Sequence, residues 1–222
     1  MVRATDHPSP NHGPRPDGAA IDMLVLHYTG MTSAAAALER LRDPAAKVSA
    51  HYLIDEDGAV LRLVDETRRA WHAGVARWRG QTDINDRSIG IELVNPGHEH
   101  GYRPFPEAQM AALTALSRGI VARHPIPARN VVGHGDIAPD RKQDPGELFD
   151  WRRLADAGVG LWPDAREGDI DQIPAMLRRH GYDTAAGGAL TAFQRHFRPT
   201  RCDGVGDRDC ARRLAGLMTM ID

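Results

Sequence analysis

Short apolar runs and longer segments of helical period alternate along most of this chain. Helices are predicted at residues 34–42, after Thr32 or Ser33 as the N-cap, and at residues 107–124. Asp57-Gly58, between two apolar runs, predicts a hairpin. The alternation indicates an α/β fold in which helices flank a mixed central sheet. Five runs of branched apolar residues are typical of strands: 21–27, 49–54, 59–64, 88–94 and 130–134.

The two ends of the chain follow other patterns. Residues 1–20 are rich in proline and lack periodicity, which predicts an irregular arm. Strand patterns stop after Trp162, and residues 169–180, 187–197 and 207–221 predict three short helices. We therefore expect an α/β domain over residues 21–163 that carries the chemistry. A small all-helical domain should follow over residues 164–222, and it should be dispensable for that chemistry.

Two of the predicted strands end in a histidine, His27 and His134. Asp144 follows ten residues after His134 and precedes Pro145, which favours an extended backbone. If the two strands are neighbours in one sheet, both imidazoles stand over the same edge. Imidazole and carboxylate groups suit zinc, and a catalytic zinc takes three protein ligands and leaves a position for water. The pattern predicts one zinc ion per chain, held by His27, His134 and Asp144. Either histidine taken alone would more often be structural.

Glu92 interrupts the apolar run at 88–94 with a carboxylate. Such a group must face outward, pair with a cation or sit in a functional site, because an unpaired buried charge is costly. Lys142 lies two residues before Asp144 and points into the same loop, unless it is an ordinary surface lysine.

Other candidates lie in loops. Trp71 and His72 open a long polar loop to Arg87, where they would line a substrate cleft or close the loop. His98 and His100 read as part of a solvated loop. His51 reads as a structural histidine, and His196 as a packing or surface residue.

Five linked motifs follow one another along the chain: Leu26-His27-Tyr28-Thr29, Ser49-Ala50-His51-Tyr52-Leu53-Ile54, Ala70-Trp71-His72-Ala73-Gly74, Ile89-Gly90-Ile91-Glu92, and His134 through Asp144-Pro145-Gly146. In order and at suitable spacing over about residues 21–162, they resemble the zinc-dependent N-acetylmuramoyl-L-alanine amidases of the AmpD/AmiD type. Residues 193–199 and Asp203-Gly204 are similar to the small helical domain that follows the catalytic domain in the AmiD-like branch, a module that resembles peptidoglycan-binding domains.

The resemblance implies that His27, His134 and Asp144 are the zinc ligands. It makes Glu92 the catalytic acid and base, and Lys142 the cation that stabilises the oxyanion. The implied reaction cleaves the amide between N-acetylmuramic acid, or its 1,6-anhydro form, and L-alanine. More distant relatives often carry a tyrosine at the position of Ala50 and a cysteine as the third ligand, so this chain departs from them.

Two other functions stay open on the sequence. The first is a peptidoglycan-recognition module that kept the fold and lost catalysis. Loss of a ligand would mark that outcome, and none of the three is lost. The second is another zinc hydrolase, such as a peptidase, although the His-Glu-x-x-His motif is absent.

The resemblance implies peptidoglycan or muropeptide fragments as partners, and composition gives no reason to expect others. A formal net charge of −2 over 222 residues gives no electrostatic reason to expect nucleic acid. No apolar run approaches the ~20 residues that cross a bilayer. The first residues hold no apolar segment of a secretory signal, from which we expect a cytoplasmic protein. The likeness of the C-terminal part to envelope-located relatives keeps the periplasm or cell envelope as the alternative. For Cys202 and Cys210, two reduced thiols are favoured over a pair.

Overall fold

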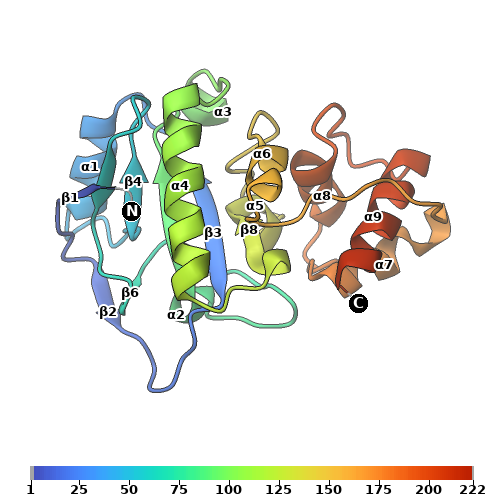
Figure 1. Ribbon diagram of the computed structural model, residues 1–222, viewed down its shortest axis with the longest axis horizontal. Coiled ribbons are helices and arrows are strands. Elements are labelled where there is room, and N and C mark those ends of the chain that lie inside the picture. Colours follow the sequence, from blue (N-terminus) through green and yellow to red (C-terminus); the bar gives the residue numbers. More distant parts are fainter. Residues whose placement is uncertain (1–2, 222) are drawn as a thin grey trace.

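A six-stranded mixed sheet forms the centre of the protein, whose computed structural model describes residues 3–221 (Figure 1). The predicted α/β class is confirmed. Neighbouring strands run parallel except for the β4–β5 hairpin, which is antiparallel as the Asp57-Gly58 turn predicts. In spatial order the strands are β1 (Ala4–Asp6), β5 (Val60–Arg62), β4 (Tyr52–Ile54), β7 (Ser88–Leu93), β3 (Met23–Tyr28) and β8 (Val131–Gly133).

At the first helix, local chemistry sets both ends. Ser33 caps the first helix by accepting from the backbone N–H of Ala36, and Asp43 ends it directly before Pro44. The helices are α1 (Ala34–Arg42), α2 (Ile84–Arg87), α3 (Gly97–His100), α4 (Glu107–Arg123), α5 (His134–Ile137), α6 (Trp151–Asp156), α7 (Ile173–His180), α8 (Ala189–Phe197) and α9 (Arg208–Ile221), with 3₁₀ turns at Ala128–Asn130 and Ile170–Gln172.

The two faces of the sheet are covered by different elements, because successive strand residues point to opposite faces. Leu24 and Leu26 of β3 pack with α4 and α6 in one hydrophobic cluster. Met23 and Val25 face the other side and pack with the C-terminal helices. At the other end of this second face, Leu53 of β4 packs under α1. Over the middle of this second face, a space remains between α1 and the loop of residues 141–144.

The prediction of an irregular N-terminal arm is wrong. Strand β1 extends the sheet by pairing in parallel with β5, and β2 (His12–Pro14) pairs antiparallel with β6 (Arg68–Ala70). Arg15 then donates to four backbone carbonyl oxygens, those of Glu66, Asn85, Asp86 and Ser88. The prolines misled because both strands are short and lie at sheet edges, where proline is tolerated.

The C-terminal part forms the three helices that the sequence predicts, α7, α8 and α9. They pack beside β8 and α5, at the right of Figure 1. One hydrophobic cluster joins Phe193 and Leu214 of these helices to Val25 and Val132 of the sheet. The sequence pattern changes near residue 163, but the hydrophobic core continues across that point. Cys202 and Cys210 are free thiols.

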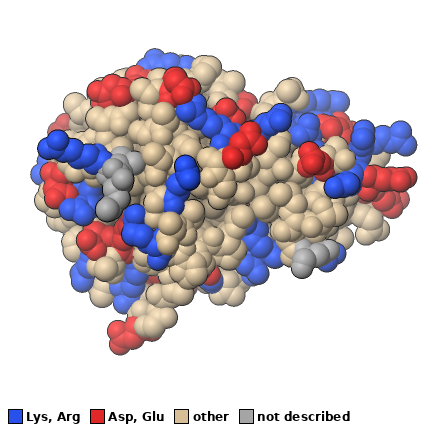
Figure 2. Space-filling model, in the orientation of Figure 1, with Lys and Arg blue, Asp and Glu red and all other residues tan. Residues whose placement is uncertain are grey.

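Charges of both signs are interspersed over the face shown in Figure 2, on the sheet part and on the helical part alike. In the described part of the chain, residues 3–221, no helix is both long enough and apolar enough to span a bilayer.

Candidate active site

The sheet topology brings the two strand-end histidines together. Strands β3 and β8 are parallel neighbours in which Leu26 lies opposite Gly133. His27 follows Leu26 directly, and His134 follows Gly133 directly, so the two histidines lie side by side. The loop after α5 then returns Asp144, whose backbone carbonyl oxygen accepts a hydrogen bond of 2.8 Å from the N–H of Gly135. The adjacency inferred from two apolar runs is confirmed.

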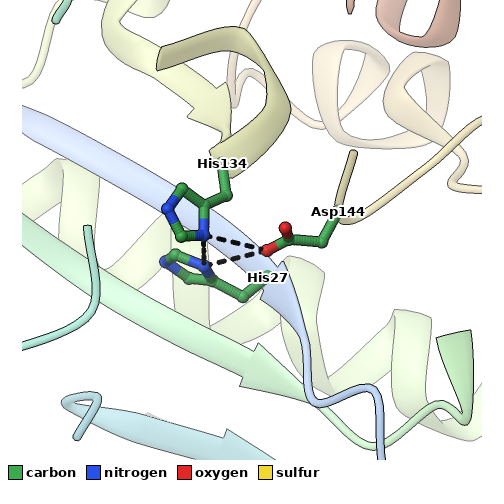
Figure 3. Close-up of side chains that lie close together, drawn as sticks. All are labelled: His27, His134 and Asp144. Atoms are coloured by element: carbon green, nitrogen blue, oxygen red, sulfur yellow. Dashed lines mark hydrogen bonds and ion pairs between the residues drawn. The ribbon is translucent and has the colours of Figure 1, made fainter. Parts of the chain in front are cut away.

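The three side chains converge on one point from β3, α5 and the loop before Pro145 (Figure 3). His27 Nδ1 lies 3.0 Å from His134 Nδ1 and 3.1 Å from Asp144 Oδ2. His134 Nδ1 lies 3.3 Å from the same carboxylate oxygen. All three residues are buried.

Hydrogen bonds on the outer side of each ring settle which nitrogen carries the proton. His134 Nε2 lies 3.0 Å from the carbonyl oxygen of Ala73, which can only accept, so Nδ1 of His134 presents a lone pair. His27 Nε2 lies 3.1 Å from His72 Nδ1, and His72 Nε2 lies 3.1 Å from Ser88 Oγ. Ser88 in turn donates to the carbonyl oxygen of Ile84 at 2.7 Å. In this series of hydrogen bonds, each donor therefore points away from the cluster: His27 donates to His72, and His72 donates to Ser88. His27 Nδ1 then also presents a lone pair.

Burial lowers the pKa of His27 to about 4, which favours the neutral imidazole. Burial of Asp144 acts to raise its pKa, but attraction and hydrogen bonds to His134 and His27 outweigh it and lower the pKa of Asp144. These two pKa shifts conflict. The lowered pKa of His27 leaves its imidazole neutral, whereas an imidazole attracts the Asp144 carboxylate fully only as a cation. A bound cation removes the conflict. Two neutral imidazoles and one carboxylate, with their lone pairs facing one another, fit the ligand set of zinc.

Glu92 stands beside this cluster and faces inward. In the parallel pair of β3 and β7, Glu92 lies opposite His27, so both side chains project from the same face of the sheet. Oxygen Oε2 of Glu92 is shielded from solvent and has no hydrogen-bond partner within residues 3–221. Burial, reinforced by the charge of Asp144, raises the pKa of Glu92 well above its usual range. The outward-facing alternative for Glu92 is therefore excluded.

A cavity of about 420 Å³ opens over the cluster. It collects every site residue predicted from the sequence. Lys142, Trp71 and His72 line it, and α1 forms one wall with Arg40 and Leu41. His72 also supports His27 from behind, as described above. The predicted set in this cavity comprises His27, Trp71, His72, Glu92, His134, Lys142 and Asp144.

Part of the cavity wall comes from a residue that the sequence did not indicate as a site residue. His98, assigned to a solvated loop, lies at the cavity, where its ring stacks on Tyr102 with centroids 4.2 Å apart. Its Nδ1 lies 3.0 Å from the hydroxyl of Tyr28, and its Nε2 lies 3.2 Å from Glu147. The signal in the sequence was Gly97, directly before His98; in the fold it has φ +67°, and a Cβ there would lie 2.6 Å from the Tyr28 ring.

On this α/β fold, a buried cluster of two histidines and an aspartate that could hold a metal ion lies beside a carboxyl group and an ammonium group in an open cavity. The sequence model described as N-acetylmuramoyl-L-alanine amidase matches residues 17–147. The chain belongs to this family, and the enzyme class expected from the sequence is confirmed.

Named relatives agree with this assignment. The chain is 39% identical to N-acetylmuramoyl-L-alanine amidase AmiD of Escherichia coli, over 85% of this chain and 79% of that protein. It is 38% identical to 1,6-anhydro-N-acetylmuramyl-L-alanine amidase AmpD of Escherichia coli, over 69% of this chain and 91% of that protein. A solved structure of Escherichia coli AmiD in complex with anhydro-N-acetylmuramic acid-L-Ala-D-γ-Glu-L-Lys superposes with a TM-score of 0.82, at 38% identity, covering 93% of this chain and 92% of that one.

Proposed function

We propose that this protein hydrolyses the amide bond between N-acetylmuramic acid, or its 1,6-anhydro form, and L-alanine, using one zinc ion. The ligands are His27, His134 and Asp144. One observation carries the proposal: three lone pairs converge beside the inward-facing carboxyl group of Glu92, at the floor of an open cavity. The similarity to the amidases AmiD and AmpD, and the anhydromuramyl peptide in the AmiD complex, support this substrate.

When bound, zinc supplies a Lewis acid and lowers the pKa of a coordinated water to about 7. The chain's own groups move the protons. Glu92 takes a proton from the attacking water and delivers it to the nitrogen of the leaving L-alanine. Its shielded environment suits this exchange, because a raised pKa lets a carboxyl group hold a proton near neutral pH.

Lys142 supplies positive charge where negative charge develops. It lines the cavity with Glu92 and Asp144, on the loop that carries Asp144. An ammonium group aimed at the developing oxyanion stabilises the transition state more than the neutral amide of the substrate. Trp71 offers an apolar ring at the same cavity for the substrate.

Defined muropeptides test the activity. We expect the zinc-loaded protein to release an L-alanine-terminated peptide from a muramyl peptide and from its 1,6-anhydro form, and mass analysis of both products identifies the bond. Wild-type protein should contain one zinc ion per chain, and His134→Ala should contain much less. Equal zinc in both proteins would remove His134 from the ligand set. Intact substrate with fully loaded wild-type protein would favour the non-catalytic recognition module.

The helical part and the cellular location need separate tests. We propose that residues 164–222 add affinity for peptidoglycan strands, on the resemblance of that part to peptidoglycan-binding domains. Co-sedimentation with purified sacculi measures this, and wild-type protein left in the supernatant would contradict it. The cytoplasmic location stays a prediction, and cell fractionation that finds the protein in the envelope would overturn it.

A further inference from the structure

A buried carboxyl group outside the cavity links the C-terminal helices to the turn that carries the metal ligands. Asp136 lies in α5, two residues after His134, and is 3% exposed. Its Oδ2 accepts the backbone N–H of Gly133 at 2.7 Å. The other donors come from the helical part: His196 Nδ1 lies 2.7 Å from Oδ2, and the Tyr182 hydroxyl lies 2.7 Å from Oδ1. Two of these three hydrogen bonds therefore cross from beyond residue 163.

Both distant donors are held firmly. The ring of His196 lies between Trp151 and Phe197, with centroids 3.7 Å and 3.9 Å away and interplanar angles of 15° and 11°. Tyr182 is buried and packs edge-on against Trp78 at 5.2 Å. Because these rings sit in a close-packed interior, neither donor can turn away from Asp136 without opening a void.

The position of α5 sets the position of two metal ligands. His134 is its first residue, directly after Gly133, whose N–H is bound by Asp136. The N–H of Gly135 is bound by the backbone carbonyl oxygen of Asp144. A shift of Asp136 would therefore move His134 and Asp144 together, away from His27, which is fixed separately in β3.

The C-terminal helical part also contacts the loop between His134 and Asp144. A Cβ at Gly188, which precedes α8, would lie 2.3 Å from the carbonyl oxygen of Pro139. Arg195 of α8 donates to Gln143 at 3.4 Å, one residue before Asp144. The contacts with Asp136 thus belong to a wider interface along residues 133–144.

We propose that the C-terminal helical part is a positioning element of the metal site, in which Tyr182 and His196 fix Asp136 and Asp136 fixes the turn that presents His134 and Asp144. The proposal rests on the proposed function for the identity of the ion. It replaces the expectation that this part is dispensable for the chemistry. Tyr182 and His196 do not line the cavity, so their hydrogen bonds reach the ligands through Asp136.

Two variants of the full chain test the link with little change of shape. Tyr182→Phe removes one hydroxyl oxygen, and His196→Phe keeps a ring between Trp151 and Phe197 but removes the Nδ1 donor. We expect each to weaken zinc binding by about 10- to 100-fold, the range typical of groups that orient metal ligands. Competition with a chromophoric chelator measures the Kd for Zn²⁺. At saturating zinc, kcat on a muropeptide should fall while KM changes little, because substrate contacts are untouched.

Tyr52→Phe is the matched control. Tyr52 is also a buried tyrosine whose hydroxyl donates at 2.7 Å to a carboxylate, that of Glu66, but it packs with α4 on the opposite face of the sheet. Its Kd for zinc should stay within about twofold of wild type. His196→Asn restores a donor near the position of Nδ1 and should recover part of the lost affinity, which a purely packing role for His196 would not predict.

Wild-type zinc affinity in folded Tyr182→Phe and His196→Phe proteins would overturn the proposal. Equal weakening in Tyr52→Phe would also overturn it, because the loss would then reflect general destabilisation. Should a variant fold only with metal, the rise of its Tm with zinc concentration gives the same Kd. A wild-type protein that binds zinc but leaves muropeptides intact would refute the proposed function and leave this test valid. A wild-type protein that binds no zinc would refute both.

Discussion

Each residue of the site owes its chemistry to the partner behind it. His27 can present a lone pair at Nδ1 because His72 Nδ1 accepts a hydrogen bond from the N–H at His27 Nε2, and His72 is oriented in turn by Ser88. Gly90 makes room for this arrangement, since a Cβ there would lie 2.5 Å from the His72 ring. Glu92 is the exception: its shielded oxygen has no partner within residues 3–221, which leaves it able to exchange a proton.

Replacing Glu92 separates proton transfer from metal binding. Glu92→Gln keeps the size of the side chain but cannot accept a proton from water, so we expect kcat to fall by about 10²- to 10⁴-fold. Zinc content and Tm should stay close to wild type, because Glu92 is not a ligand. Lys142→Ala should likewise keep its zinc and lose turnover. The exposed Glu167→Gln is the control. Wild-type kcat in fully metallated Glu92→Gln would remove Glu92 from the mechanism.

His72 should matter for the metal more than for the substrate. His72→Phe preserves a ring but leaves the N–H of His27 Nε2 without its acceptor. We expect the Kd for zinc to rise by about 10- to 100-fold, as is usual when the group that orients a ligand histidine is lost. Chelator competition measures it, with the exposed His100→Phe as the control. If His72 serves only to bind substrate, zinc affinity will be unchanged and KM alone will rise.

Among the elements, those that local pattern defines were predictable. The apolar runs at β3 and β8 fixed both strands and the places of His27 and His134, because both faces of these strands are buried. Strands β1 and β2 escaped detection because short edge strands need no apolar run. The link from Asp136 to His196 also left no local signal, because its two partners are 60 residues apart.

Glu66 connects the segment before β6 to the C-terminal end of α4 through hydrogen bonds. It accepts from Arg123, His124 and Tyr52 at 2.6–2.7 Å. Partial burial acts to raise its pKa, but these hydrogen bonds prevail and lower the pKa of Glu66 from an ordinary 4.5 to about 2. Because the folded-state pKa lies below the unfolded value, the stabilisation is fully present above pH 4.5 and is lost as the pH falls through about 2.

We therefore expect Glu66→Gln to lower Tm at pH 7, with a difference from wild type that shrinks as the pH falls from 4.5 towards 2. Release of zinc at low pH affects both proteins alike, so the difference in Tm isolates Glu66. Thermal melts across this range measure it. The exposed Glu39→Gln should show no such trend. A difference that is constant with pH would show that the loss at Glu66 is one of packing and not of charge.

On the scale of the whole molecule, two parts of the chain with different sequence patterns share one hydrophobic core. The family match ends at residue 147, so the family's shared pattern does not include the three C-terminal helices. In this chain those helices nevertheless cover part of one face of the sheet, at β3 and β8, and pack against the loop that follows β6. The apolar side chains on the sheet side of that contact include Met23, Val25, Trp78, Ile84, Val132 and Ile137.

Removing residues 164–222 should therefore cost this protein its stability as well as its zinc affinity. Each large apolar side chain that becomes exposed costs about 1.5–3 kcal/mol. Several together match the ~5–15 kcal/mol net stability of a typical domain. We expect a chain ending at Pro163 to aggregate, or to melt well below the full chain in calorimetry. As the control, a protease site inserted after the exposed Ala165 allows the chain to be cut while the helices stay in place, and this cut protein should keep its Tm and zinc. A shortened chain with wild-type Tm and kcat would contradict this expectation. It would show that residues 164–222 are dispensable, as the sequence predicts.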